Sequence, residues 1–400
     1  MQNKAERSAE YIFQGTMYFY RPYKIQCRYQ YTLHEAVDPA LMQQALTGAV
    51  ARAPYFAQRL VWEKGEAFLE PNPAPCRLRL GSAMPEMPEQ TDGYLFSVSC
   101  EGATVFIDWN HFIADGHGIA RLIVLLLQLY WNLRYGAGFA CAPLVCSPAY
   151  DVAALLAHAP GPRAESLQSD ALQTFEGTPH RSLIRITKRS LVQAAAPCGA
   201  KPFCALLALL SEGVGLYLGK EQVRYAYSTD TRAEAGVPDA AYNCVASFQH
   251  DVRFGPDTRL QDVLPGVDAA VRAALAPESK LHRMAEQMGW IYKVSQQKAP
   301  LKIKQRIFQM GEYISCVPAD FWLSYLGSPL EPGARALEPY IREFQVWVPP
   351  DGASIGFEAA SLNGEITLCV QNKADAPGLT EALRTVFARE GLTVLEAREL

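Results

Sequence analysis

The chain has 400 residues, of which 49% are hydrophobic and 20% charged, and its formal net charge at pH 7 is −4. This composition is ordinary for a globular protein, and the length predicts two or three domains. The small negative charge gives no electrostatic basis for binding nucleic acid or an anionic membrane surface. We therefore expect no nucleic-acid partner.

The cysteines and the N-terminus indicate a cytoplasmic location. Ten cysteines are spread from Cys27 to Cys369 without paired metal-ligand spacing, a usage that favours reduced thiols over a disulfide framework. The first residues turn polar where a signal peptide needs an apolar core. The most apolar run, Leu122 to Leu127, is far shorter than the roughly 20 residues that cross a bilayer. We predict no membrane span.

The first third of the chain predicts alternating strands and helices. An aromatic, alternating run from Tyr23 to Leu33 is typical of a strand. Asp38 can cap a helix and Pro39 suits its first position, and Ala53-Pro54 ends that helix. The predicted elements that follow are a strand at 56–62, a proline-rich loop at 71–93, a hairpin of strands at 94–99 and 103–109, and an apolar helix at about 118–135.

Residues 136–179 are rich in Ala, Pro, Gly and Ser, which indicates a crossover between two halves. We therefore predict an N-terminal unit at 1–175 and a C-terminal unit at 176–400. The second half predicts strands at 183–187, 223–228, 242–248, 250–254, 321–326, 344–348, 354–359 and 365–371, and helices at 202–218, 260–276, 280–288 and 379–390. Strands and helices interleave with hairpins, which favours an α+β fold with mixed β-sheets flanked by helices over a doubly wound fold.

The segment Asn110–Gly116, NHFIADG, lies between the hairpin and the apolar helix. A histidine at a strand-to-helix junction can face a cleft, where the near-neutral pKa of an imidazole suits a general base. The alternative is that His111 is a core histidine with satisfied hydrogen bonds. Asp115 can cap the helix, or turn inward and pair with a buried arginine. Gly116 and Gly118 permit a close backbone approach or a positive φ.

A metal site is a further interpretation, because His111, Asp115 and His117 are closely spaced. Three such ligands would suit a catalytic zinc ion. The helical H-E-x-x-H spacing is absent, however, and nothing nearby supplies a supporting glutamate. We therefore predict no metal.

A basic run in the second half also has two interpretations. It can bind phosphates of a cofactor or carrier, or form a solvated helix face, which its spacing favours. Its members are Lys293, Lys298, Lys302, Lys304 and Arg306. No glycine-rich dinucleotide loop, phosphate-binding P-loop or G-x-S-x-G nucleophile elbow is present.

NHFIADG resembles the HHxxxDG signature of the condensation-domain and alcohol-acyltransferase superfamily, whose relatives include plant BAHD acyltransferases and chloramphenicol acetyltransferase. Asn110 stands where that family has its first histidine, whereas the second histidine, which carries the chemistry in the family, is kept as His111. Further passages that resemble the family, in the family's order and across most of the chain, are Val37–Leu60, Tyr225–Arg232 with its Asp-x-Arg ending, Tyr242–Ser247 and Ser324–Gly327.

The resemblance implies two chloramphenicol acetyltransferase-like lobes arranged in a V, with a central tunnel where donor and acceptor meet at His111. It implies that His111 takes the acceptor proton, that Gly116 forms the turn, and that Asp115 forms a salt bridge that shapes the loop. Arg232 is our candidate for the partner of Asp115. The residues that we expect in the cleft are Asn110, Asn243 and Ser324.

The resemblance further implies an acyltransferase that moves an acyl group from a thioester to an alcohol or amine. We expect no bound cofactor; acyl-CoA or acyl-phosphopantetheine would be a co-substrate. No convincing serine for phosphopantetheine attachment is present, so we predict a stand-alone enzyme, with an acyl carrier protein as a separate partner if one is used. One alternative, suggested by Asn110, is a non-catalytic or degenerate member that binds an acyl or peptidyl ligand. Another is a metal-dependent hydrolase.

Overall fold

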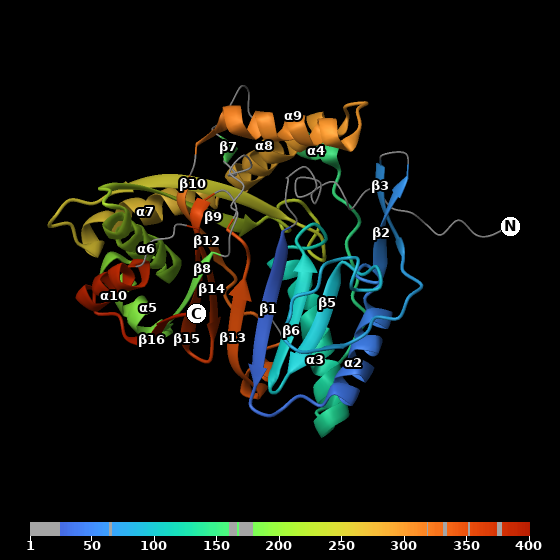
Figure 1. Ribbon diagram of the computed structural model, residues 1–400. Coiled ribbons are helices and arrows are strands. Elements are labelled where there is room, and N and C mark those ends of the chain that lie inside the picture. Colours follow the sequence, from blue (N-terminus) through green and yellow to red (C-terminus); the bar gives the residue numbers. More distant parts are fainter. Residues whose placement is uncertain are drawn as a thin grey trace.

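The computed structural model describes residues 25–400 except 64–65, 160–165, 168–178, 318, 331–333, 351–352 and 374–377. Two mixed sheets organise these residues, each with helices packed against it (Figure 1). The predicted start of the first strand at Tyr23 and part of the predicted crossover lie outside the described residues. The predicted α+β class with mixed sheets flanked by helices is confirmed.

The first sheet has five strands in the order β13-β1-β6-β5-β4. We call this sheet and its two helices the first lobe. The helices, α2 (Pro39–Arg52) and α3 (Gly116–Tyr135), share one hydrophobic core with the strands. Asp38 caps α2 as predicted, accepting hydrogen bonds from two backbone amides of its first turn. The strands are β1 (Gln26–Leu33), β4 (Arg79–Leu80), β5 (Phe96–Glu101), β6 (Thr104–Asn110) and β13 (Ile341–Trp347), and a separate hairpin comprises β2 (Gln58–Glu63) and β3 (Glu66–Pro71).

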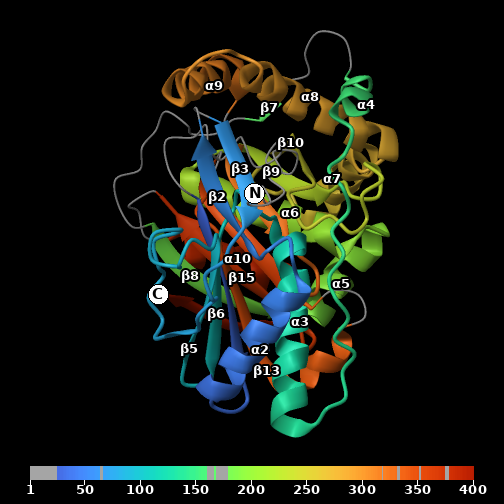
Figure 2. The same cartoon turned by 90° about the vertical axis from the view of Figure 1, so that its right-hand side faces the viewer.

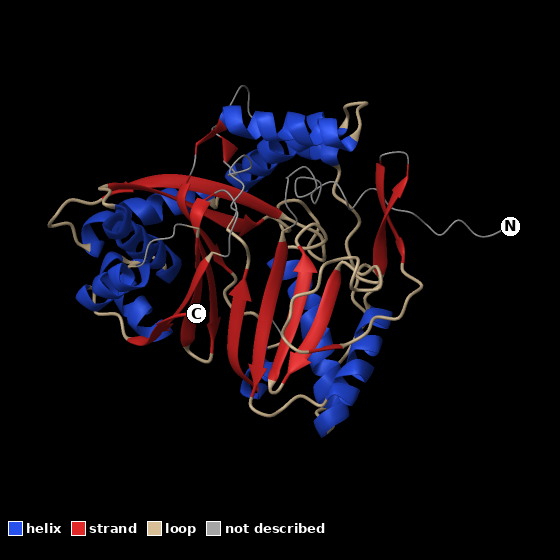
Figure 3. Cartoon of the chain, in the orientation of Figure 1, coloured by secondary structure: helices blue, strands red, loops and turns tan. Residues whose placement is uncertain are grey.

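The second sheet has seven strands in the order β10-β9-β12-β14-β15-β8-β16. Helices cover one of its faces (Figure 3), and with them it forms the second lobe. The strands are β8 (His180–Thr187), β9 (Gln222–Asp230), β10 (Val245–Arg253), β12 (Ala319–Tyr325), β14 (Ala353–Leu362), β15 (Glu365–Asn372) and β16 (Val394–Glu399). The helices on that face are α5 (Lys188–Ala195), the short η1 (Ala196–Cys198), α6 (Pro202–Leu218), α7 (Leu260–Ala274) and α10 (Leu379–Arg389).

The remaining elements gather at one end of the molecule, at the top of both ribbon views (Figure 1, Figure 2). They include α8 (Pro277–Ser295), which contacts β10, and α9 (Leu301–Ser315). The other elements there are α4 (Val152–Leu156) and the paired strands β7 (Ser166–Leu167) and β11 (Cys316–Val317), whereas η2 (Arg335–Tyr340) leads into β13.

One strand crosses the predicted division between the halves. β13 lies far along the second half of the sequence, yet it pairs antiparallel with β1 in the first sheet. The next strand, β14, returns to the second sheet and pairs with β12 and β15. The first lobe is therefore built from two distant parts of the chain. The division at residues 175 and 176 stays a prediction.

Several predicted elements differ from those observed. The strands expected at 242–248 and 250–254 are one strand, β10, which begins at Val245, so 242–244 is loop. The helix expected at 280–288 is the longer α8, and α5, α9, β3 and β16 were not predicted. The basic run is divided between the end of α8, the following turn and α9. No single helix of the described residues is long and apolar enough to cross a bilayer, although α5 with η1 and α6, bent by 96°, pass the length and hydropathy criteria together.

Candidate functional site

The loop that joins β6 to α3 has hydrogen-bond partners for its successive carbonyl groups. The Asn243 amide nitrogen donates to the carbonyls of His111 and Phe112, at 3.0 and 3.1 Å. Tyr55 Oη donates to the Ile113 carbonyl at 2.6 Å. Trp109 Nε1 donates to the Ala114 carbonyl at 2.9 Å. Buried carbonyls without partners are costly, so this network fixes the conformation of the loop. Asn243 comes from the second half of the chain, whereas Tyr55 and Trp109 come from the first.

Asn243 also fixes the tautomer of His111. The Asn243 nitrogen is assigned by its two bonds to carbonyls, because only an amide nitrogen can donate. The remaining amide oxygen lies 3.1 Å from His111 Nδ1 and must accept a hydrogen bond from it. Nδ1 therefore carries the proton, and Nε2 carries the lone pair. This tautomer is the one that a general base acting through Nε2 requires.

Asn110, where the motif departs from the family signature, has a local structural role. Its Oδ1 accepts from the backbone amide of Phe112 at 3.0 Å, and its backbone carbonyl accepts from Ile113 at 3.1 Å. Asparagine commonly forms such turns by bonding to the backbone two residues on. The side-chain oxygen of Asn110 therefore shapes the loop.

Asp115 is both a helix cap and one half of a buried ion pair. Its Oδ1 accepts from the Gly118 amide at 2.8 Å as the N-cap of α3, and lies 2.7 Å from Arg232 Nη2. Its Oδ2 accepts from the Cys244 amide at 2.8 Å. The two readings of Asp115 from the sequence, cap and ion pair, are thus combined in one carboxylate. The structure brings Arg232 to the position in which we expected the partner of Asp115.

The ion pair is held in a region closed to water. The side chains of Asp115 and Arg232 are 4% and 7% exposed. Burial by itself would raise the pKa of Asp115, but the Arg232 guanidinium and the hydrogen bonds to the carboxylate together lower that pKa below its ordinary value. The pKa of Arg232 is raised by Asp115 despite its own burial. Both groups are therefore charged.

Arg232 also organises the chain around Asn243. Its Nε donates to the carbonyl of Ala240 at 2.9 Å and its Nη2 to that of Tyr242 at 3.0 Å. Its Nη1 forms a second ion pair with the more exposed Asp230, at 2.8 Å. One guanidinium thus holds the end of β9, the loop before β10 and the start of α3 together.

The glycines at the start of α3 are needed for close approach and not for a positive φ. A Cβ on Gly118 would lie 1.9 Å from the Ala241 carbonyl oxygen, which is backbone of the second half. A Cβ on Gly116 would lie 2.5 Å from Tyr29 Oη and 2.6 Å from a methyl carbon of Leu326. The start of α3 is therefore packed directly against the loop at 241 and the end of β12.

Ser324, the third residue that we expected in the cleft, lies on β12 two residues before Leu326. Its register partner on β14 is Glu358, with which it shares a side-chain hydrogen bond. Glu358 was not among the predicted site residues; the available signal was one acidic residue in the otherwise apolar run of β14. Tyr55 and Trp109 were also missed, because nothing in the local pattern distinguishes their loop contacts from core packing.

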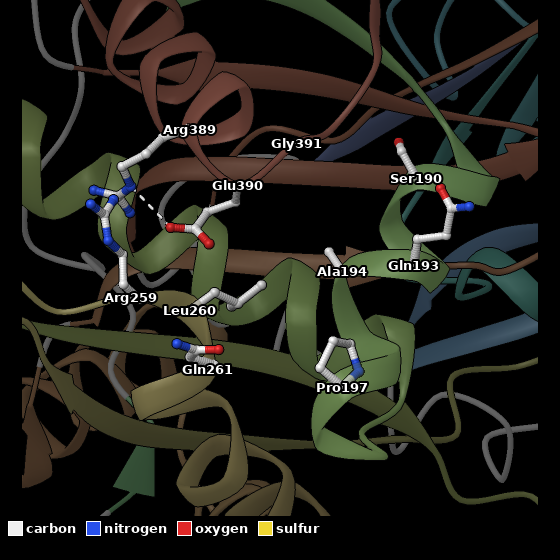
Figure 4. Close-up of a pocket in the computed structure, with 10 residues that line it drawn as sticks. All are labelled: Ser190, Gln193, Ala194, Pro197, Arg259, Leu260, Gln261, Arg389, Glu390 and Gly391. Atoms are coloured by element: carbon white, nitrogen blue, oxygen red, sulfur yellow. Dashed lines mark hydrogen bonds and ion pairs between the residues drawn. The ribbon is translucent and has the colours of Figure 1, made fainter.

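The positions of potential metal ligands and of one cavity can be compared with this site. Among the described residues, no group of three or more His, Cys, Asp and Glu side chains is arranged to hold a metal ion. A cavity of about 610 Å³ lies between α5, η1, α7 and the end of α10 (Figure 4). Its charged residues include Arg389 and Glu390, which are hydrogen-bonded to each other at 2.9 Å. None of the lining residues comes from the β6–α3 loop.

Comparisons with known proteins identify the fold. No family model matches the chain, and neither does any curated protein sequence. The structure is similar to polyketide synthase associated protein 5 from Mycobacterium tuberculosis, with 15% identity and a TM-score of 0.63 over 93% of this chain and 95% of that one.

Two further solved structures have the same TM-score of 0.63. The first condensation domain of the calcium-dependent antibiotic synthetase, in complex with a substrate analogue, has 14% identity over 96% of this chain and 94% of that one. TRI101 of F. graminearum, complexed with coenzyme A and T-2 mycotoxin, has 12% identity over 96% and 98%. The chain therefore has the condensation-domain fold, which confirms the two lobes of mixed sheets and helices that the resemblance implies.

We predict that Asp115→Ala lowers the free energy of unfolding by about 3–5 kcal/mol, because it leaves Arg232 buried and unpaired. The matched control is Asp230→Ala, which removes the more exposed partner of the same arginine, 38% exposed, and should cost about 1 kcal/mol or less. Denaturant unfolding measures both. Equal losses would contradict the assignment of Asp115 as the main partner.

The comparison of the wild type with Asp115→Ala also gives a pH test. The folded pKa of Asp115 is lowered, so its stabilising contribution is present above the unfolded pKa of about 3.9 and is lost as pH falls through the folded pKa. The difference in unfolding free energy between wild type and Asp115→Ala should therefore shrink below about pH 4.

We predict that Gly118→Ala destabilises the protein by about 1–3 kcal/mol or more, because the new methyl group overlaps a backbone carbonyl. The matched control is Gly266→Ala in α7, where a Cβ would meet nothing within 4 Å. That change should be stabilising by up to about 1 kcal/mol, since alanine favours a helix over glycine. Thermal unfolding of both variants checks the prediction, and a neutral Gly118→Ala would contradict it.

We predict that the ¹⁵N chemical shifts of the His111 ring show a protonated Nδ1 in the wild type. Asn243→Ala removes the oxygen that accepts this proton, so the Nε2–H tautomer should then become populated. A wild-type spectrum with the proton on Nε2 would refute the assigned tautomer. The remaining histidines serve as internal references for the shifts.

Proposed function

We propose that this protein is an acyltransferase that moves an acyl group from a thioester to an alcohol or amine, with His111 as general base. The observation that carries the proposal is the contact of Asn243 with His111, which places the lone pair on Nε2. Further support comes from fold neighbours that include TRI101 with coenzyme A and a condensation domain with a substrate analogue. The donor would be acyl-CoA or the acyl-phosphopantetheine of a separate acyl carrier protein.

In this mechanism His111 Nε2 takes the proton from the acceptor hydroxyl or amine as its oxygen or nitrogen attacks the thioester carbonyl. The carbonyl π electrons move onto oxygen to give a tetrahedral intermediate. When that intermediate collapses, the C–S bond breaks and the departing thiolate receives the proton from Nε2. A positioned base of this kind contributes about 10²–10⁴-fold. The Asn243 oxygen would stabilise the imidazolium that exists between the two transfers.

The roles of the neighbouring residues follow from their contacts. Asp115 and Arg232 would not touch substrate; they would hold the loop that presents His111, with Gly116 and Gly118 allowing the close contact between the lobes. Donor and acceptor would enter from opposite faces of a V formed by the two lobes and meet in a tunnel at His111. We propose a cytoplasmic location, in keeping with the nine described cysteines, all of which are free.

The non-catalytic alternative was suggested by Asn110. Its side-chain oxygen forms a turn within the loop, while His111 is oriented by Asn243. The replacement of the first histidine of the signature therefore leaves the proposed base and its orienting partner in place. This supports the catalytic proposal over a protein that only binds an acyl or peptidyl ligand.

We predict that His111→Ala lowers thioester turnover by about 10²–10⁴-fold while the protein stays folded, because the base is lost and the buried ion pair is untouched. Release of free thiol from short and long acyl-CoA, measured with a panel of alcohols and amines, tests this. His34→Ala is the matched control, since His34 is exposed and should have no effect. Full transferase activity in His111→Ala would refute the mechanism, and loss of activity on adding a chelator would favour the metal-dependent hydrolase.

A further inference from the structure

Glu358 is a buried acid that forms no ion pair with a described lysine, arginine or histidine. It is 6% exposed in the middle of β14. Burial raises its pKa to about 8, although a hydrogen bond with Ser324 acts in the opposite direction. Within the described part of the chain, no lysine, arginine or histidine contributes to this shift. A buried carboxylate is stable only with a partner charge or strong hydrogen bonds, so Glu358 is positioned either as a neutral acid or to receive a cation.

The described titratable groups nearest to Glu358 are two thiols and one phenol, and the Arg181 guanidinium lies near enough to Cys369 to act on the pKa of that thiol. Cys27 and Tyr29 of β1 lie near enough to Glu358 for its charge to act on their pKa values, and Cys369 is its register partner on β15. Burial and the nearby Glu358 raise the pKa of each of these three groups. All three are therefore neutral near pH 7, so an ionised Glu358 would find no compensating charge among them.

Glu358 belongs to a row of polar side chains across the second sheet. Its neighbour on β12 is Ser324, and Ser247 of β10 pairs with Ser228 of β9. Leu323 pairs with Tyr227, which places Ser324 beside Ser228. Because side chains alternate along a strand, this row lies on the face opposite the core that contains Tyr227, Leu323 and Phe357.

The residues on the two sides of Glu358 differ in how deeply they are buried. Beyond Glu358, Cys369 and Leu183 form a buried cluster with Trp347 of β13. On the other side of Glu358, Ser324 and Ser228 are both only partly buried. A ligand that reached Glu358 would therefore approach it along the serines.

The row lies on the side of the second sheet that meets the first lobe and the start of α3. Ala360 and Leu362, farther along β14, belong to the core of the first lobe, and Leu326 contacts the start of α3. The His111 backbone amide bonds to Ile25, at the start of β1. Cys27 and Tyr29 lie two and four residues farther on, which corresponds to about 7–13 Å along the strand.

We propose that Glu358 recognises the acyl acceptor, and that this acceptor carries an ammonium group several bonds away from the hydroxyl or amine that reacts at His111. The inference rests on the proposed acyl transfer for the identity of the reaction. On binding, the ammonium would pair with the Glu358 carboxylate, any proton on the carboxyl being released to solvent. Ser324 and Ser228 would bind polar groups between the two ends. A charged hydrogen bond contributes about 1.5–3 kcal/mol, or roughly 10–100-fold in affinity.

The test measures binding without turnover, in the His111→Ala protein. Amino alcohols with four to eight methylene groups are titrated at pH 7.5 beside diols of the same length, which replace the ammonium with a neutral hydroxyl. We expect at least one amino alcohol to bind about tenfold or more tightly than its diol. Adding Glu358→Gln should abolish that preference, whereas the control Glu365→Gln, at the start of β15 and off the row, should keep it.

Two results would overturn the proposal: equal affinity for amino alcohols and diols at every length, or a preference that survives Glu358→Gln. Failure of the proposed transferase function would instead appear as absent thioester turnover by the wild type, which the binding titration does not use. The two failures are therefore distinguishable.

Folding of the Glu358→Gln protein can be checked independently. A raised folded pKa means that the contribution of Glu358 to stability is present below the unfolded pKa of about 4.3 and is lost as pH rises towards the folded value of about 8. Glutamine stays neutral at every pH. The variant should therefore be at least as stable as the wild type above pH 8.

Discussion

The buried ion pair between Asp115 and Arg232 is the interaction on which the site depends. A charge removed from water needs compensation from nearby groups, and each member of this pair is the buried counter-charge of the other, from the opposite half of the chain. Asp115 receives the Arg232 guanidinium and the Cys244 amide, while Arg232 also binds the carbonyls that precede Asn243. The loop at 230–244 can satisfy these groups only by lying against the start of α3.

That constraint places Asn243 at His111. The asparagine lies in the loop directly before β10, next to the two residues, Tyr242 and Cys244, that Arg232 and Asp115 bind. Once there, its amide accounts for two carbonyls and one ring nitrogen with all three hydrogen bonds pointing in chemically unambiguous directions. The electrostatic pair therefore determines position, and the amide determines the protonation pattern of the ring. The position of Asn243 and the tautomer of His111 therefore depend on different interactions.

Local chemistry explains how much of this arrangement could be predicted from the sequence. The cap at Asp38, the apolar helix after NHFIADG and the small residues at 116 and 118 have short-range signatures, and the family resemblance supplied Arg232 as a partner. The pairing of β13 with β1, and the contacts of Tyr55 and Glu358, depend on residues far apart in the sequence. The separate strands expected from 242 to 254 failed for a related reason, since residues 242–244 are held by Arg232 and Asp115 and not by a sheet.

The pairing of β13 with β1 has a consequence for biosynthesis. As the chain leaves the ribosome, β1 emerges early but its neighbour β13 follows some 300 residues later, at a synthesis rate of about 5–20 residues per second. For roughly 15–60 s the nascent first lobe lacks its outer strand and exposes an unpaired edge, which is the feature that promotes faulty strand pairing between molecules. Native order in this lobe is thus delayed until translation is nearly complete, and the protein matures as one unit and not half by half.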